Sequence, residues 1–151
     1  MRPLFVRIAR LLLALHSRGI HPMNDTSELV VWTPREFNAV ADHVVNCALD
    51  DQRSWHASNN LALAQSLLEG RSFRLSVDGG RRSSTEAAIG LMRFAVNISE
   101  HGVATYELLA RCGKLLENVS SAFLSEAMAL EWGLQYLVEL LKGKVTATRS
   151  Q

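Results

Sequence analysis

The hydrophobic period of the sequence changes at Phe73, and this change constrains the possible folds more than any other feature. Along Phe73–Asp78 apolar and polar residues alternate, as they do in a β-strand with one buried face. Two further β-rich runs cover 87–96 and 104–115, and apolar residues then recur at helical spacing from about 120 to 141. The pattern predicts an antiparallel meander of three strands followed by a long helix, and therefore an α/β fold.

The upstream part of the chain predicts a helix, a strand and a second helix. Apolar residues recur at helical spacing over about 3–18 and 36–49, and the short run 28–32 is rich in β-forming residues. The segment that follows is polar and aperiodic at its start, which is typical of a linker. The predicted organisation is a helix–strand–helix unit at 1–50, a linker at 51–72, and the meander with its helix at 73–151.

Composition and charge narrow the function classes only slightly. With 48% apolar and 21% charged residues, the chain has the composition of an ordinary globular domain. The net charge of +1 gives no global basic character, so any contact with nucleic acid has to come from local patches. Arginines are dense around the first strand of the meander, where a solvated surface is the simplest interpretation. These are Arg71, Arg74, Arg81, Arg82 and Arg93.

The two cysteines indicate the redox state of the cellular compartment in which the protein is expected. Cys47 and Cys112 are far apart and follow no metal-ligand spacing. Both are most simply small core residues in a reducing environment. The sequence therefore favours an intracellular location, nuclear or cytoplasmic, over secretion.

The amino-terminal segment has two interpretations. Arg7 and Arg10 interrupt its apolar run, which is too short to span a bilayer, so no membrane association is expected. Because the segment is Arg-rich, acid-free and amphipathic, it could be a mitochondrial presequence. The apolar stripe on one helical face favours a helix of the domain. The stripe consists of Leu4, Ile8, Leu11 and Leu15.

Asp78 is the first candidate for chemistry. It ends the alternating run and is followed by Gly79 and Gly80. Two residues without side chains would let a nucleic-acid backbone approach the carboxylate closely. An ordinary Asp–Gly turn at the end of a strand is the alternative interpretation.

Two further acids belong to longer patterns. Glu126 lies in Ala-x-x-x-Glu-Ala-x-Ala-Leu-x-x-Gly-Leu, which covers Ala122–Leu134, whereas Glu131 lies further round the helix and is expected to be solvated. Asn38 and Asp42 lie four residues apart on one helix face. They belong to Arg-x-x-Asn-x-x-Ala-Asp, formed by Arg35, Asn38, Ala41 and Asp42. Taken singly, each acid could be an ordinary surface carboxylate of its helix.

Together these motifs resemble the ribonuclease H domain of the plant and retroelement type. The resemblance implies a ribonuclease H-like α/β fold, in which the meander and additional strands form a mixed sheet packed with helices. It implies that Asp78, Glu126 and Asp42 are catalytic ligands of Mg²⁺ (or Mn²⁺). It further implies two-metal endonuclease hydrolysis of the RNA strand of an RNA–DNA hybrid. The nucleic-acid contacts that it implies fall on Gly79, Gly80, Arg81, Asn38 and Arg35.

The two halves of this pattern stand in the opposite order from the family. Residues of about 3–49 match the end of the family domain and about 73–141 match its beginning. The chain is therefore either a permuted domain or a fragment of tandem units. In a permuted domain the tail Lys144–Gln151 would supply the strand that is otherwise unassigned. Two copies could also exchange halves in a homodimer.

One metal ligand of the family has no counterpart. The family carries a further Asp at the end of the unassigned strand, and the tail Thr148–Gln151 contains no acid. Loss of a ligand weakens cation binding, so whether the chain retains endonuclease activity stays open. One alternative is a catalytically inactive ribonuclease H-like remnant that binds nucleic acid or a protein. Another is an α/β interaction module with coincidental motifs.

Overall fold

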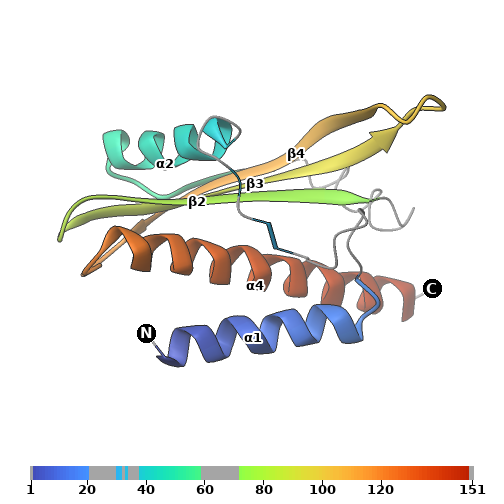
Figure 1. Ribbon diagram of the computed structural model, residues 1–151, viewed down its shortest axis with the longest axis horizontal. Helices are drawn as coiled ribbons and strands as arrows, with labels where there is room; N and C mark the ends of the chain where they lie inside the picture. The colour runs from blue at the N-terminus through green and yellow to red at the C-terminus, as the bar shows by residue number, and fades with distance from the viewer. Residues whose placement is uncertain (1, 21–29, 32, 34–37, 59–71, 150–151) are drawn as a thin grey trace.

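The computed structural model describes residues 2–20, 30–31, 33, 38–58 and 72–149. Three helices and four strands lie in these residues. In chain order they are α1 (Arg2–Ser17), α2 (Ala39–Asp51), β1 (Trp55–Ser58), β2 (Phe73–Ser83), β3 (Glu86–Ile98), β4 (Ala104–Leu116) and α4 (Ala122–Arg149). They form layers: α2 lies on one face of the sheet, α4 crosses the other face, and α1 packs outside α4 (Figure 1).

The sheet has the order β1-β4-β3-β2, and every pair described is antiparallel. The predicted meander of three strands is therefore confirmed, and the fold class is α/β. The additional strand β1 comes from the segment predicted as a linker, so that prediction is wrong for Trp55–Ser58. Among the described residues no parallel pair makes the sheet mixed, and the predicted strand at 28–32 lies largely outside them.

The helix α1 is part of the packed domain, as its apolar stripe predicted. Leu4, Ile8 and Leu15 are buried in one cluster with residues of α4. The guanidinium of Arg7 donates two hydrogen bonds to the Glu131 carboxylate, at 2.8 and 3.2 Å. Glu131, expected to be solvated, therefore ties α1 to α4. Within the described ranges, no helix is long and apolar enough to cross a membrane.

Two predicted boundaries differ from the structure. The strand β2 does not end at Asp78 but continues to Ser83, because Asp78, Gly79 and Gly80 all keep partners in β3. The tail from Lys144 is helical as far as Arg149 and does not form the strand that a permuted domain would need. A single glycine in a helix interior costs only about 1 kcal/mol, so Gly143 does not end α4.

The two halves of the chain pack into one body. The helix α2, from the first half, contacts β2, β3 and β4, while α1 contacts α4 from the second half. Ala88 of β3 is buried in one cluster with three residues of α2, namely Val45, Ala48 and Leu49. One chain therefore brings its own halves together around the shared sheet.

Candidate functional site

Two acids from two different helices lie near Asp78. Asp78 lies in β2, Asp42 in the first turn of α2 and Glu126 near the start of α4. Burial raises the pKa of Asp78 to about 6, and the charge of Asp42, a hydrogen bond with the Asp42 carboxyl and the charge of Glu126 raise it as well. A hydrogen bond from the backbone N–H of Gly79 acts in the opposite direction. The local environment of Asp78 is thus rich in negative charge.

Asp78 points to the face of the sheet that α2 covers. On β2, Arg74 and Ser76 line a hollow together with residues of α2, and Gly80 lies beneath Val45 of α2. Because side chains alternate along a strand, Asp78 shares their face. Its half-buried carboxyl sits within a continuous strand. It is therefore neither a strand-end residue nor part of an Asp–Gly turn.

A glycine of β3 brings Asp42 to Asp78. Gly90 is the cross-strand partner of Asp78, and a Cβ on it would lie 2.9 Å from the Ala41 carbonyl oxygen and 3.2 Å from the Val45 nitrogen. The backbone of α2 therefore rests directly on the sheet. The Asn38 amide donates a hydrogen bond of 3.0 Å to the Val77 carbonyl and fixes the start of this helix.

A glycine of β2 brings Glu126 to the same point. A Cβ on Gly79 would overlap the Ser125 carbonyl and lie 2.6 Å from the Glu126 nitrogen. The first turns of α4 can approach β2 this closely because Gly79 has no side chain. Glu126 itself is exposed, so its carboxylate is accessible beside the edge strand.

The glycine pair does not serve the role predicted from sequence. The backbone of α4 occupies the space beside Gly79. The side chain of Val45 occupies the space beside Gly80, and its Cγ1 would lie 2.8 Å from an added Cβ. The close approach expected for a nucleic-acid backbone is made by the protein's own helices. The two glycines position the acids and leave no room above themselves for a ligand.

The other predicted contact residues have structural partners or lie outside the described residues. Arg81 donates from Nε to the Val119 carbonyl at 2.8 Å, which holds the segment leading into α4. Asn38 anchors α2, as described above. Asp42 accepts a hydrogen bond of 3.2 Å from the Asn46 amide. Arg35 lies outside the described residues.

The three acids have the oxygen ligands that a cation site needs, but their side chains are not arranged around one common point. Carboxylate oxygens are the ligands that Mg²⁺ prefers, and the pKa of Asp78 is raised first by burial and then by the neighbouring charges of Asp42 and Glu126, which a cation would neutralise. Across the residues that the structure describes, however, no group of three or more His, Cys, Asp or Glu side chains is assembled to hold a metal ion. The donor set fits the ion chemically, and Glu126, the exposed member, would have to turn inward to complete it.

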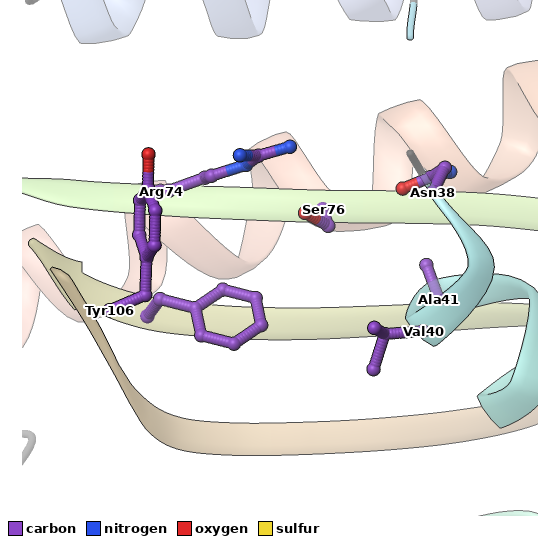
Figure 2. Close-up of a pocket in the computed structure, with 7 residues that line it drawn as sticks. Asn38, Val40, Ala41, Arg74, Ser76 and Tyr106 are labelled. Carbon is purple, nitrogen blue, oxygen red and sulfur yellow. The ribbon is translucent and has the colours of Figure 1, made fainter. Parts of the chain in front are cut away.

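A hollow of about 140 Å³ next to these acids was not predicted. It is surrounded by Arg74 and Ser76 of β2, by Tyr106 of β4 and by Asn38, which directly precedes α2 (Figure 2). Its lining is completed by Val40, Ala41 and Phe94. The alternation of side chains along β2 could have placed Arg74 and Ser76 on the same face as Asp78. The pairing of the strands is needed to bring Tyr106 to them.

Arg93, predicted as a solvated arginine, is fully buried. It lies opposite Leu75 in the sheet, and its guanidinium carbon is 5.2 Å from the centre of the Phe73 ring. Burial lowers the pKa of Arg93, while Tyr136 of α4 raises it in partial compensation. Its Nε and Nη1 atoms have no hydrogen-bond partner in the structure. The simple view of these arginines as surface charges is wrong at this position.

Compared with known proteins, the chain matches no family model, and no curated protein or solved structure is significantly similar to it. Similarity therefore assigns neither a family nor a function. The function has to be argued from the converging acids and from the surfaces beside them.

Proposed function

We propose that the chain binds nucleic acid and hydrolyses the RNA strand of an RNA–DNA hybrid at Asp78, Asp42 and Glu126. The activity is the one that the ribonuclease H resemblance implies. One observation carries the proposal: Asp42 and Glu126, which come from separate motifs and from elements far apart in the chain, both act on the Asp78 carboxyl. Ordinary surface acids tend to stay apart, because their like charges repel.

The roles of the three acids follow from their surroundings. Asp78 and Asp42 form the core of the site, since their carboxyls interact with one another and both lie on rigid elements. Glu126 approaches from α4 and is free enough to adjust to a ligand. With a pKa of about 6, Asp78 is mostly ionised at pH 7 and available as a ligand. These three residues would hold Mg²⁺ or Mn²⁺.

The chemistry that two bound cations supply at such a site is activation of a water and neutralisation of charge on the departing 3′-oxygen. The chain's own residues supply orientation. The backbone N–H of Gly79 holds the Asp78 carboxylate, and Asn46 holds that of Asp42. Asn38 fixes the start of α2 on Val77, next to Asp78. Ligands preset in this way need little rearrangement when the substrate arrives.

The test is cleavage of a hybrid whose RNA strand is end-labelled, with Mg²⁺ or Mn²⁺ as cofactor. Wild-type protein should cut the RNA strand, and Asp78→Asn should lower the rate by more than about 100-fold, because it removes the central ligand. Asp50→Asn is the matched control. Asp50 is an exposed acid of α2 that pairs with Arg82 at 2.8 Å, so its loss should leave the rate unchanged.

Several outcomes would contradict the proposal. Wild-type protein that leaves the hybrid intact with both cations is one of them. Equal cleavage by wild type and Asp78→Asn is another, since it would assign the activity to a different site or to a contaminant. Single-stranded RNA and duplex DNA of the same sequence belong in the same assay, because they report the substrate class.

A second candidate is a protein that binds nucleic acid without cleaving it. Two observations favour it: the described acids are not assembled as a metal site, and the fourth acid of the family has no counterpart in the sequence. Such a protein would bind the hybrid with an affinity that falls steeply with salt, insensitive to chelators, and with no turnover.

A further inference from the structure

The hollow beside Asp78 lies where an uncovered part of the sheet begins. It is formed by the start of α2 and by β2, β3 and β4. Beyond it, apolar side chains of the β3–β4 hairpin are exposed: Tyr106 by 51%, Leu108 by 43% and Ile98 by 59%. A contiguous exposed apolar surface is characteristic of a binding site.

The side chains around the hollow suit a planar, aromatic ligand. Tyr106 and Phe94 meet edge to face with ring centres 6.2 Å apart, and Tyr106 remains half-exposed. The guanidinium carbon of Arg74 lies 5.6 Å from the centre of the Tyr106 ring. Figure 2 shows Arg74 extending past Tyr106 toward Ser76 and Asn38. Aromatic rings and arginine planes are the groups on which proteins stack nucleobases.

The size of the hollow also limits the ligand. Sites for drug-sized molecules begin at about 300 Å³, and this hollow has about 140 Å³. It therefore has room for one small ring system. Ser76 and Asn38 add a hydroxyl and an amide, which can hydrogen-bond to the edge of such a ring.

The hollow and Asp78 lie along the same face of β2. Arg74, Ser76 and Asp78 follow one another on the same face of β2, and residues four apart on a strand are separated by about 13 Å. A nucleic-acid strand rises about 3.4 Å per nucleotide in a duplex, so a strand held at Asp78 would reach Arg74 within a few nucleotides. The positive charge of Arg74 suits such a strand.

We propose that this hollow binds an unpaired nucleobase next to the hybrid, stacked against Tyr106 and Arg74. The inference rests on the proposed function and names the preferred substrate: a hybrid that carries a single-stranded overhang. The base has to be unpaired, because bases inside a duplex expose no face for stacking. The lining is mainly apolar and carries the polar groups of Arg74, Ser76 and Asn38, a combination that suits the apolar face and the polar edge of a base.

The test compares the affinity for two fluorescent hybrids, one blunt and one with a short single-stranded overhang, in fluorescence anisotropy. Full-length Asp78→Asn protein keeps the substrate intact. It should bind the overhang hybrid about tenfold or more tightly than the blunt one. Adding Tyr106→Ala should abolish the preference, whereas Tyr106→Phe, which keeps the ring, should retain it. Phe123→Ala is the matched control: Phe123 is 56% exposed and lies on α4 against Phe5, 6.2 Å between ring centres.

A second probe does not depend on protein variants. An overhang made of abasic nucleotides keeps the phosphates and removes the bases, so it should bind no better than the blunt hybrid. Equal affinity for abasic and normal overhangs would overturn the inference, and so would a preference that survives Tyr106→Ala. If wild-type protein cleaves blunt hybrids and the preference is absent, the inference fails and the proposed function stands. If neither hybrid is bound or cleaved, both fail.

Discussion

The two faces of the sheet are covered to different extents. On one face α4 runs along the sheet with α1 packed behind it, while on the other the shorter α2 covers only part of the strands (Figure 1). The α4 side carries a continuous apolar cluster shared with α1. The α2 side carries Asp78 and Asp42 and leaves Tyr106 half-exposed. Both faces therefore carry buried apolar clusters, and the α2 side in addition leaves part of the sheet uncovered.

On both faces, a glycine in the sheet allows the backbone of a helix to approach closely. Gly79 admits the backbone of α4, and Gly90 admits the backbone of α2. The helices differ in how firmly they are held. Because α4 is buried between the sheet and α1, it has little freedom to move, whereas α2 has no second helix packed behind it among the described residues. A side chain added at each glycine should therefore have different consequences.

The largest effect is expected for Gly79→Ala. Its Cβ would overlap the Ser125 carbonyl, which is backbone and cannot rotate away. We expect the free energy of unfolding to fall by about 3 kcal/mol, at the upper end for overpacking, and Tm to fall by roughly 6 to 12 °C. Thermal unfolding followed by circular dichroism measures this change.

Gly133→Ala is the control on the same face. Its Cβ would meet Val77 Cγ1 at 2.7 Å and Leu75 Cδ2 at 2.9 Å, which are side-chain ends that can turn. Alanine also favours a helix over glycine by about 1 kcal/mol. A loss in Gly133→Ala as large as that in Gly79→Ala would show that backbone contact is not what distinguishes the two sites.

A smaller loss of stability with a clear electrostatic effect is expected for Gly90→Ala. The new Cβ would push against Ala41 O, 2.9 Å away, and α2 can respond by shifting. We expect a loss of about 1 to 2 kcal/mol and a fall in the pKa of Asp78 from about 6 toward its ordinary value, because Asp78 becomes less buried and Asp42 moves away. Titration of the Asp78 carboxyl carbon by NMR measures the second effect.

Gly80→Ala separates packing from electrostatics on the α2 face. The added Cβ would meet only side chains, Val45 Cγ1 at 2.8 Å and Leu49 Cδ1 at 3.9 Å, so the pKa of Asp78 should stay near 6. If Gly90→Ala lowers the free energy of unfolding but the pKa of Asp78 in that variant stays near 6, the position of α2 does not set the coupling between Asp78 and Asp42.

The sequence predicted the elements well because their signals are local. The period-two run at Phe73 and the apolar stripe of α1 each reflect burial against one neighbour, and both elements form as expected. The acids were found for the same reason, since Asp42 and Glu126 sit in short patterns on single helices. That these acids approach Asp78 depends on helix packing, which short patterns do not encode.

What the sequence missed depends on long-range register. In β3 the pairing shifts after Arg93: Arg93 lies opposite Ala110, whereas Phe94 lies opposite Leu108. Strict alternation along β4 would put Leu108 and Ala110 on one face, but the shift separates them. The sequence could not reveal that Arg93 is buried, because that face of β3 is covered only when the distant helix α4 packs on it. Nor could it indicate that Tyr106 joins Arg74 on the α2 side.

The subtlest test of the comparison is the stability of Asp78→Asn as a function of pH. Because the folded pKa of Asp78, about 6, lies above the ordinary value of about 3.9, the folded state binds a proton more tightly than the unfolded state. The stability from this group is complete below pH 4 and is lost as the pH rises through 6.

Asparagine does not titrate and can still donate to Asp42. The variant should therefore match wild type near pH 4 and exceed it by about 1 to 2 kcal/mol at pH 7, after allowance for the partial exposure of Asp78. Urea unfolding at several pH values measures the difference, and Asp50→Asn should show no such trend. An Asp78→Asn variant less stable than wild type at pH 7 would mean that the acids on the α2 face stabilise the fold.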